Sequence, residues 1–432
     1  MLDKIFKLRD NATTIRQEII AGCTTFMAMA YILAINPDIL SIAGASKESI
    51  FVATALASFF GSVLMGVLAN LPIGLAPSMG LNTFFAVTVV TAMGHSYPFA
   101  LVAVFISGVL FMLMSLFNVR EAIVNAIPKN LKISLSVGIG LFITIVGLKS
   151  SGIIVGDPHT LLTLGNLSTP SVILGFIGIA TAAILLVLKI PGAILISIIF
   201  ATIVGIPMGV THVPEGFSPI STSIGLTNHF ADFDWSQILT FDMLIVVLTF
   251  MFVAIFDVVG TLIGVCSSAK ILDVNGNVPN IKKALFADAV TTTVGATLGT
   301  STVGSYVESA AGVVAGGRTG LTAVTVGLLF LISLFFAPIF LIIPGAATCC
   351  ALVLVGLFML RGVQLIDFDD LSEAIPSFLT IIFIPLSYSI ASGIMIGVIS
   401  YVLINLVVGK RRKLTTAMII LALLFIVKFV WL

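Results

Sequence analysis

The chain has 432 residues, a formal net charge of +1 and only 9% charged residues, while 59% of its residues are apolar. A soluble domain usually carries about 25% charged residues. This composition excludes a soluble globular protein, because too few polar side chains remain to cover a surface that faces water. It predicts an all-α integral membrane protein with room for roughly fourteen spans of about 20 residues and short loops.

Fourteen apolar runs, separated by polar or helix-breaking residues, follow one another along the chain. They cover residues 19–35, 50–68, 75–91, 99–117, 131–148, 172–188 and 193–206 and then, after a polar stretch, 243–266, 284–298, 300–314, 322–342, 349–359, 377–390 and 394–408. No small-residue cleavage site follows the polar N-terminal residues, so we expect the first span to be retained. The final run, 417–432, is short and contains Lys428, which predicts an interfacial or peripheral helix.

The Lys and Arg residues orient these spans in the membrane. If the N-terminus is cytoplasmic, every cation except Lys47, Lys149 and Lys428 falls before the first span or in a connection after an even-numbered span. Cytoplasmic loops are enriched in Lys and Arg, so this distribution predicts that both termini face the cytoplasm. The longest predicted extracellular connection, 207–240, contains no Lys or Arg.

Seven spans on each side of this connection form two halves that must have opposite orientations, because seven is odd. A short similarity favours such an inverted repeat, since Ile127-Pro128 and Ile343-Pro344 are each followed by a Gly-Leu-Phe triplet. The third span of each half, which is the third and the tenth of the chain, contains Pro, Gly and Ser residues that break a helix. A broken backbone at membrane depth is tolerated where protein or a watery cavity satisfies it, so both breaks predict the binding site.

Two carboxylates lie within predicted spans. Glu308 follows the small-residue stretch 299–305 in the tenth span, and Asp257 interrupts the long apolar run of the eighth. Ionisable groups inside a membrane are rare, and their default interpretation is functional. Burial disfavours the charged form of Asp257, which predicts a group that exchanges a proton. The alternative for either residue is a buried carboxyl that only caps backbone N–H groups at a broken helix.

Five segments carry a resemblance that covers nearly the whole chain in order. Residues 24–32, 75–85, 256–262, 299–323 and 373–380 resemble the AzgA-like branch of the nucleobase transporters, and the block around Glu308 is the most specific. The resemblance implies the uracil-permease-like fold, with fourteen segments in a 7+7 inverted repeat and a short β-strand in each broken span. Two residues depart from the family pattern: Ser78 stands where Gly is usual, and Val258 where Thr is usual.

The same resemblance implies a division into two domains and a function. We expect a core domain from 1–120 and 241–342, a gate domain from 121–206 and 343–410, an extracellular connection at 207–240 and a basic C-terminal segment at 411–432. The implied activity is proton-coupled uptake of adenine, guanine or hypoxanthine across the cytoplasmic membrane. No cofactor, metal or nucleic-acid partner is expected, and the sequence leaves open whether the gate domain forms a homodimer.

The chemistry of a purine base agrees with these carboxylates. A base is flat, neutral and rich in N–H donors, so an ionised Glu308 can accept two adjacent N–H groups in a charge-assisted contact. The start of a half-helix beside Glu308 would favour its charged form. Asp257 is predicted to carry the proton, to contact the base, or both.

Five further residues are candidates for contacts with the base: Asn82, Phe84, Phe85, Thr261 and Phe26. The amide of Asn82 can donate and accept hydrogen bonds, and its alternative role is to tie the broken backbone ends. Aromatic rings stack on bases with about 1–3 kcal/mol, and we expect one of Phe84 and Phe85 to do so. Thr261 follows Asp257 by one helical turn, on the same face of the helix. Its hydroxyl is expected to bind either that carboxylate or the ligand; the alternative is that Thr261 only packs against a neighbouring helix.

Two charged residues have a structural interpretation, because Glu373 lies near a span end and Arg318 at a cytoplasmic end. Rival functions fit less well. A channel needs a ring of carbonyls or charges along a pore, and a transporter of small anions would not place Glu308 beside its substrate. An enzyme would show a catalytic motif, and none is found. The alternatives to purine uptake are transport of another base, uracil or xanthine, or of a small anion on the same fold.

Overall fold

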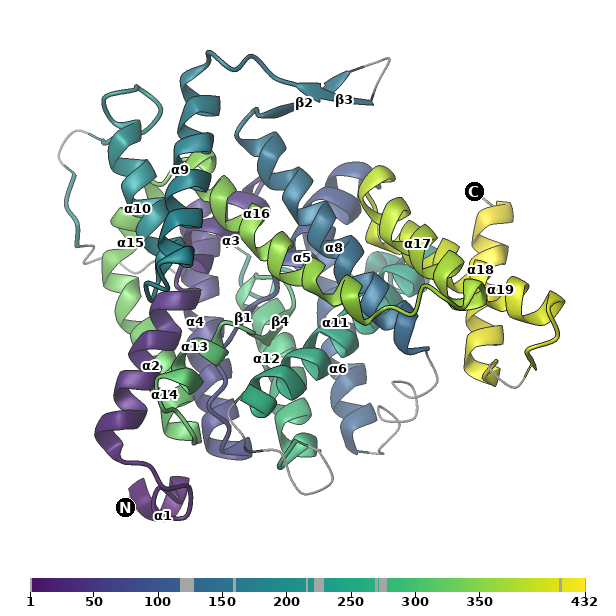
Figure 1. Ribbon diagram of the computed structural model, residues 1–432, viewed down its shortest axis with the longest axis horizontal. Coiled ribbons are helices and arrows are strands. Elements are labelled where there is room, and N and C mark those ends of the chain that lie inside the picture. The colour runs from purple at the N-terminus through teal and green to yellow at the C-terminus, as the bar shows by residue number, and fades with distance from the viewer. Residues whose placement is uncertain are drawn as a thin grey trace.

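The computed structural model describes residues 2–116, 128–157, 161–214, 217–220, 229–268, 271, 278–411 and 414–431, most of them in helices (Figure 1). Every predicted span corresponds to an observed element or group of elements. Among the described residues, seven helices are long and apolar enough to cross a membrane, and shorter apolar helices supply further spans. Four of the predicted cytoplasmic cations, Arg120, Lys270, Arg412 and Lys413, lie outside the described residues.

The first half begins with α1 (Leu2–Phe6), which precedes the first span. Its spans are α2 (Ile15–Met29) with α3 (Ile32–Ser41), α4 (Lys47–Leu64) with η1 (Met65–Ala69), β1 (Leu75–Pro77) with α5 (Met79–Thr83) and η2 (Phe84–Ala92), α6 (Tyr97–Leu116), α8 (Lys129–Ser150), α9 (Pro170–Val187) and α10 (Ala193–Gly205).

The second half follows the short helix η3 (Trp235–Gln237). Its spans are α11 (Phe241–Ser268), α12 (Ile281–Leu298), β4 (Val303–Ser305) with α13 (Ser309–Val314), α14 (Gly320–Ser333) with η4 (Leu334–Phe336) and α15 (Ala337–Leu341), α16 (Gly345–Leu360) with η5 (Arg361–Leu365), α17 (Leu371–Leu386) and α18 (Ile390–Val407).

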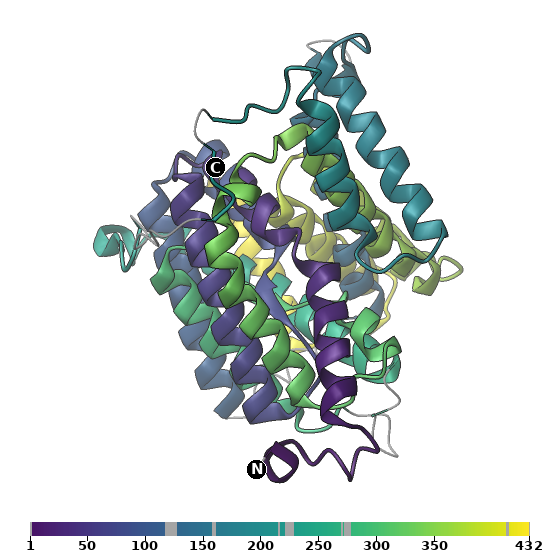
Figure 2. The same ribbon diagram turned by 90° about the vertical axis from the view of Figure 1, so that its left-hand side faces the viewer.

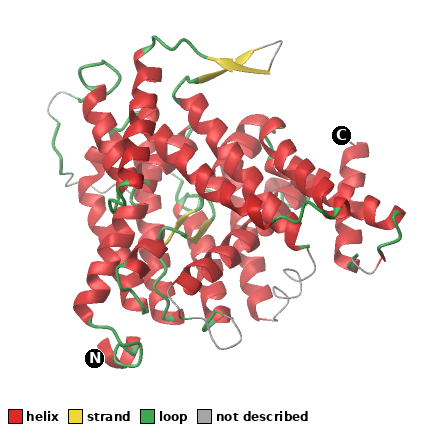
Figure 3. Cartoon of the chain, viewed as in Figure 1, coloured by secondary structure: helices red, strands yellow, loops and turns green. Residues whose placement is uncertain are grey.

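The two broken spans meet as a pair of short antiparallel strands, which confirms the strand predicted in each of them. Leu75 of β1 lies opposite Ser305 of β4, and Pro77 lies opposite Val303. All six strand residues are buried, and Figure 3 shows the pair in the middle of the molecule, surrounded by helices. Backbone N–H and C=O groups in the middle of a membrane have no water to bond with, so where each helix is interrupted the two strands form hydrogen bonds with each other.

Hydroxyl groups of neighbouring helices complete the hydrogen bonds of this strand pair. Ser62 on α4 accepts from the N–H of Leu75 at 2.9 Å and donates to its carbonyl at 3.1 Å. Thr292 on α12 donates to the carbonyl of Val303 at 2.8 Å. The outer edges of both strands are therefore bonded by side chains, as buried backbone groups require.

Contacts between the helices group them into two sets that each combine elements of both halves. We call the first set, α2, α3, α4, α6, α11, α12, α13 and α14 around β1 and β4, the core bundle, and the second, α8, α9, α10, α16, α17 and α18, the gate bundle. That they are separate core and gate domains stays a prediction. In Figure 1 the gate bundle extends from α9 and α10 at the upper left to α17 and α18 at the right. Figure 2 shows the core helices side by side, with α1 beyond their lower ends.

Two elements lie outside this plan. The hairpin of β2 (Ile154–Asp157) and β3 (Leu161–Leu164) follows α8 and was not predicted, because its exposed strands have no buried face and no alternating pattern. The final apolar run is the helix α19 (Thr416–Trp431), which packs on α18 at the edge of the molecule (Figure 1). Whether α19 lies at the membrane surface stays a prediction.

Glu18 on α2 joins the ends of three spans of the core bundle. This fully buried carboxylate accepts from the backbone N–H groups of Arg318 at 2.9 Å and Thr319 at 3.2 Å and from the hydroxyl of Thr322 at 2.6 Å. The first N–H groups of a helix have no partner within it, so Glu18 satisfies the start of α14. The Arg318 guanidinium binds two carbonyls at the end of α13, which is a structural contact.

The substitution Glu18→Gln should lower the midpoint of thermal unfolding of the purified protein. An amide NH2 group would face backbone N–H donors and leave them unpaired, at a loss of roughly 2–3 kcal/mol. The matched control is Glu48→Gln, because Glu48 is exposed in the first turn of α4. Equal midpoints for the two variants, measured by calorimetry in one detergent, would show that Glu18 does not hold these spans together.

Candidate functional site

The two broken spans meet α11 at Asp257. Ser78, the residue after β1, donates from its hydroxyl to Asp257 Oδ2 at 3.3 Å. Gly304 of β4 leaves room for this contact, because a Cβ atom there would lie 2.6 Å from Ser78 Oγ and 3.9 Å from Asp257 Oδ2. The carboxylate of Asp257 is therefore held beside the paired strands.

Glu308 lies three residues after β4, at the position that precedes α13. Its side chain makes no capping hydrogen bond to that helix. Instead, the hydroxyl of Tyr31, at the break between α2 and α3, donates to Glu308 Oε1. The bond from Tyr31 is thus the side-chain contact of Glu308 that the structure shows, and its functional role stays a prediction.

Both carboxyl residues lie beside the paired strands. Asp257 binds Ser78, the residue after β1, and Glu308 follows β4 by three residues. The hydroxyl of Tyr306 donates to the carbonyl of Pro77 at 2.5 Å, which links the broken spans a second time. Asp257 and Glu308 are partly buried, and Tyr31 and Tyr306 are buried. Residues from α11 and from both broken spans thus surround the strand pair.

Asn82 on α5 ties the broken spans together. Its amide oxygen accepts a hydrogen bond from Ser301, which precedes β4, and its side chain is fully buried. Among the described residues no group binds its Nδ2 atom. The structure therefore shows the tie between broken ends that was one of two predicted roles, and a contact with the base stays a prediction.

The three Phe residues predicted to contact a base all pack against other aromatic rings of the protein. Phe84 meets Phe250 edge-on with ring centroids 5.0 Å apart, and Phe85 meets Tyr97 at 4.8 Å; both are fully buried. The half-buried ring of Phe26 meets Phe330 at 5.1 Å. Stacking of a base on any of them stays a prediction. Thr261 is partly exposed on α11, one turn beyond Asp257.

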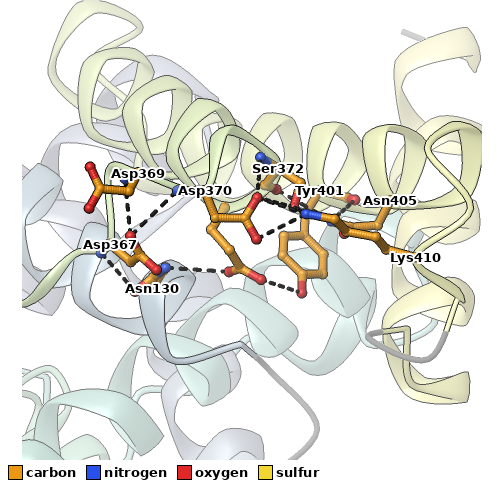
Figure 4. A network of polar contacts seen from close by, with 9 residues as sticks. Asn130, Asp367, Asp369, Asp370, Ser372, Tyr401, Asn405 and Lys410 are labelled. Carbon is orange, nitrogen blue, oxygen red and sulfur yellow. Dashed lines mark hydrogen bonds and ion pairs between the residues drawn. The ribbon is translucent and has the colours of Figure 1, made fainter.

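Figure 4 shows a polar network of the gate bundle around Asn130, Tyr401 and Lys410. Glu373 is part of this network. It accepts from the amide of Asn130 on α8 at 3.5 Å and from the hydroxyl of Tyr401 on α18 at 3.1 Å. Close by, Lys410 pairs with Asp370 at 2.9 Å. These bonds join α8, α17 and α18, which agrees with the structural interpretation of Glu373.

Sequence reasoning missed the role of Tyr31, although this residue lies in one of the segments that carry the family resemblance. No Pro or Gly marks the break at which it lies, so its only signal is a phenol within an apolar span. The two departures from the family pattern differ in kind. Ser78 binds Asp257, whereas Val258 is buried in the apolar cluster that includes Leu75 and Val303.

Two halves that meet at paired broken spans, with two carboxyl residues beside the crossing, are the features of a multi-pass membrane transporter. Residues 16–396 match the model described as the permease family, so the chain belongs to that family and is a transporter, not an enzyme. The transmembrane domain of the cyanobacterial bicarbonate transporter BicA has the same fold. It superposes with a TM-score of 0.65 at 16% identity, over 88% of this chain and 97% of that chain. This likeness confirms the predicted 7+7 inverted repeat.

Two curated relatives are similar over their whole length. The adenine permease AdeP of Escherichia coli (strain K12) is 42% identical over 431 residues, which cover 100% of this chain and 96% of the relative. The guanine/hypoxanthine permease PbuO of Bacillus subtilis (strain 168) is also 42% identical over 431 residues, which cover 98% of this chain and 99% of the relative.

The substitution Gly304→Ala should destabilise the protein, because the new methyl group would collide with Ser78 beside Asp257. Overpacking of this kind costs about 1–3 kcal/mol. In the double variant Ser78→Gly with Gly304→Ala, the hydroxymethyl group that the methyl meets is absent, so thermal stability should return toward that of Ser78→Gly alone. A double variant that melts as low as Gly304→Ala would place the collision elsewhere.

Proposed function

We propose that this chain takes up purine nucleobases across the cytoplasmic membrane, coupled to protons. The observation that supports this most directly is the 42% identity over the whole chain to permeases named for adenine and for guanine and hypoxanthine. The carboxyl groups of Asp257 and Glu308, both beside the paired strands, suit a proton and a base. The bicarbonate transporter shares the fold alone, and an anion would be repelled by these carboxylates.

In this proposal Glu308 binds the base. An ionised carboxylate accepts N–H groups in charge-assisted hydrogen bonds, which are roughly twice as strong as neutral ones. Tyr31 already binds one oxygen of Glu308, so the carboxylate is oriented before the base arrives. Asn82, Phe84, Phe85, Phe26 and Thr261 are proposed to form the remainder of the site.

Asp257 is the proposed proton carrier. Its carboxylate lies in the middle of α11, and its described hydrogen-bond partner is the neutral hydroxyl of Ser78. With no cation in that contact, the carboxyl group can hold its proton without breaking an ion pair. A negatively charged Asp257 would repel the negative charge of Glu308. When Asp257 takes up a proton this repulsion is removed, so that Glu308 can bind the base in its ionised form; loading of the proton is thereby coupled to binding of the base.

Transport is proposed to proceed by movement of the core bundle against the gate bundle. On the predicted extracellular side, Thr348 of α16 donates to Asp38 of α3 at 3.2 Å, and Thr88 of η2 donates to the carbonyl of Tyr388 at 3.3 Å. These contacts cross from one bundle to the other. Opening toward the outside therefore requires that they break. Both termini are proposed to face the cytoplasm, and homodimerisation is an open part of the proposal.

The test of the substrate is uptake of radiolabelled hypoxanthine into cells that lack their own purine permeases and express this chain. Unlabelled adenine and guanine should compete, whereas uracil and bicarbonate should not. The variant Glu308→Gln should lose at least about tenfold in uptake, because its amide presents one acceptor and a donor instead of a carboxylate. The control Glu48→Gln should transport normally. Competition by uracil or bicarbonate alone would refute the purine assignment.

A second variant, Asp257→Asn, tests the coupling. It should abolish accumulation of hypoxanthine against a gradient while the purified protein still binds the base, because an amide cannot release a proton. Accumulation is measured with and without a protonophore, and the control is Asp234→Asn, whose side chain caps η3 in the loop before α11. Protonophore-sensitive accumulation that equals the wild type would remove Asp257 from the coupling role.

A further inference from the structure

We propose that Lys47 and Lys149 are positioning residues that hold the core bundle and the gate bundle together on the predicted extracellular side. Each lysine contacts a residue of its own bundle, Asp38 or Tyr388, and that residue accepts a hydrogen bond from a threonine on the other side of the contact. The inference rests on the proposed function, because it assumes that the two bundles move apart when this side opens.

The two lysines are exceptions in the distribution of charge along the chain. All other Lys and Arg residues except Lys428 are predicted to be cytoplasmic, whereas Lys47 and Lys149 are predicted to be extracellular. Lys47 is also the first residue of α4, and a cation is unfavourable at the positive end of a helix dipole. Lys149 lies in the last turn of α8, where a cation is favourable. The position of Lys47 in particular needs another explanation, which its contact with Asp38 provides.

Lys47 and Thr348 bind different oxygens of the Asp38 carboxylate. Lys47 contacts Oδ1, and the hydroxyl of Thr348, in the first turn of α16, donates to Oδ2 at 3.2 Å. The side chain of Asp38 is only 14% exposed while the bundles are in contact, so Lys47 compensates a charge that water barely reaches. A buried charge that loses its partner is strongly destabilising. Without Lys47, the open arrangement, in which water reaches Asp38, should therefore become more favourable relative to the closed one.

The Thr348 hydroxyl has a second acceptor within its own helix. The carbonyl of Gly345 lies 2.9 Å from it, so its single hydrogen can pass from Asp38 to Gly345 when the bundles separate. Lys47 stays beside Asp38, because both belong to the core bundle. The contact can thus break without leaving a buried polar group unpaired, as a contact that opens in every transport cycle requires.

The second contact has the opposite direction. Thr88 of η2, which packs on helices of the core bundle, donates to the carbonyl of Tyr388 between α17 and α18 at 3.3 Å. Tyr388 has a φ of 54°, a left-handed conformation that is costly for a residue with a side chain. Its ring meets Phe142 of α8 edge-on with centroids 5.2 Å apart, and the ammonium of Lys149 lies 5.0 Å from the ring centre. These contacts of α8 hold the ring, and with it the backbone that presents the carbonyl to Thr88.

The test is a distance measurement by double electron–electron resonance between spin labels at Phe241→Cys and Ile173→Cys, with the four native cysteines replaced by Ala. Phe241 begins α11 in the core bundle, Ile173 lies in the first turn of α9 in the gate bundle, and both side chains are exposed. In purified protein without base, the ratio of the longer to the shorter distance should rise roughly two- to fivefold in Lys47→Gln and in Lys149→Gln. The ratio is measured within folded protein, so a lower yield leaves it unchanged.

Double variants show whether each lysine acts through its proposed partner. In Asp38→Asn there is no charge for Lys47 to compensate, so the addition of Lys47→Gln should leave the ratio unchanged. Tyr388→Asn removes the ring that Lys149 contacts, and Asn tolerates the left-handed conformation, so the addition of Lys149→Gln should also have no effect. An unchanged ratio in either single lysine variant, or a rise that persists in either double variant, would overturn the inference.

The matched control is Lys129→Gln, at the opposite end of α8 from Lys149. Lys129 is exposed and predicted to be cytoplasmic, so its loss should leave the ratio of distances unchanged. An equal rise in this variant would show a general effect of charge and would also contradict the inference. The proposed function is tested separately, by uptake of hypoxanthine and its loss in Glu308→Gln, and it stands on that result even when the ratio of distances fails to move.

Discussion

The backbone hydrogen bonds between β1 and β4 are the contact on which the rest of the structure depends. Two spans that stop in the middle of a membrane expose N–H and C=O groups where water cannot reach them. Here each break is the partner of the other, with Leu75 opposite Ser305, and the hydroxyls of Ser62 and Thr292 complete the edges. Either half alone would leave this pairing unmade.

The strand pair also determines which side chains come together. It places Ser78 beside Gly304, and the missing side chain at Gly304 lets the Ser78 hydroxyl reach Asp257. Three residues beyond the pair, Glu308 meets Tyr31 from a third break in the chain. Carboxyl residues of the eighth and tenth spans thus lie beside the same strand pair because the interrupted backbones pair with one another.

The sequence predicted the spans, both broken elements and the two carboxylates, because hydropathy and helix-breaking residues are local signals. It could not predict the partners of those carboxylates. The contact of Ser78 with Asp257 depends on the register between distant segments, and that of Tyr31 depends on a break that no Pro or Gly announces. The rings of Phe84 and Phe85 show the same limit, since an apolar span gives no sign of whether a ring faces the core or the site.

The hydrogen bonds between the core bundle and the gate bundle affect the equilibrium between the outward-open and outward-closed states. The predicted extracellular side of this contact is held by the bonds from Thr348 to Asp38 and from Thr88 to Tyr388. Lys47 pairs with Asp38, and Lys149 lies 5.0 Å from the centre of the Tyr388 ring. Two such hydrogen bonds contribute about 1–3 kcal/mol in total. A bias of that size corresponds to roughly five- to 150-fold in population, which the differential binding of a single small cargo molecule is able to reverse.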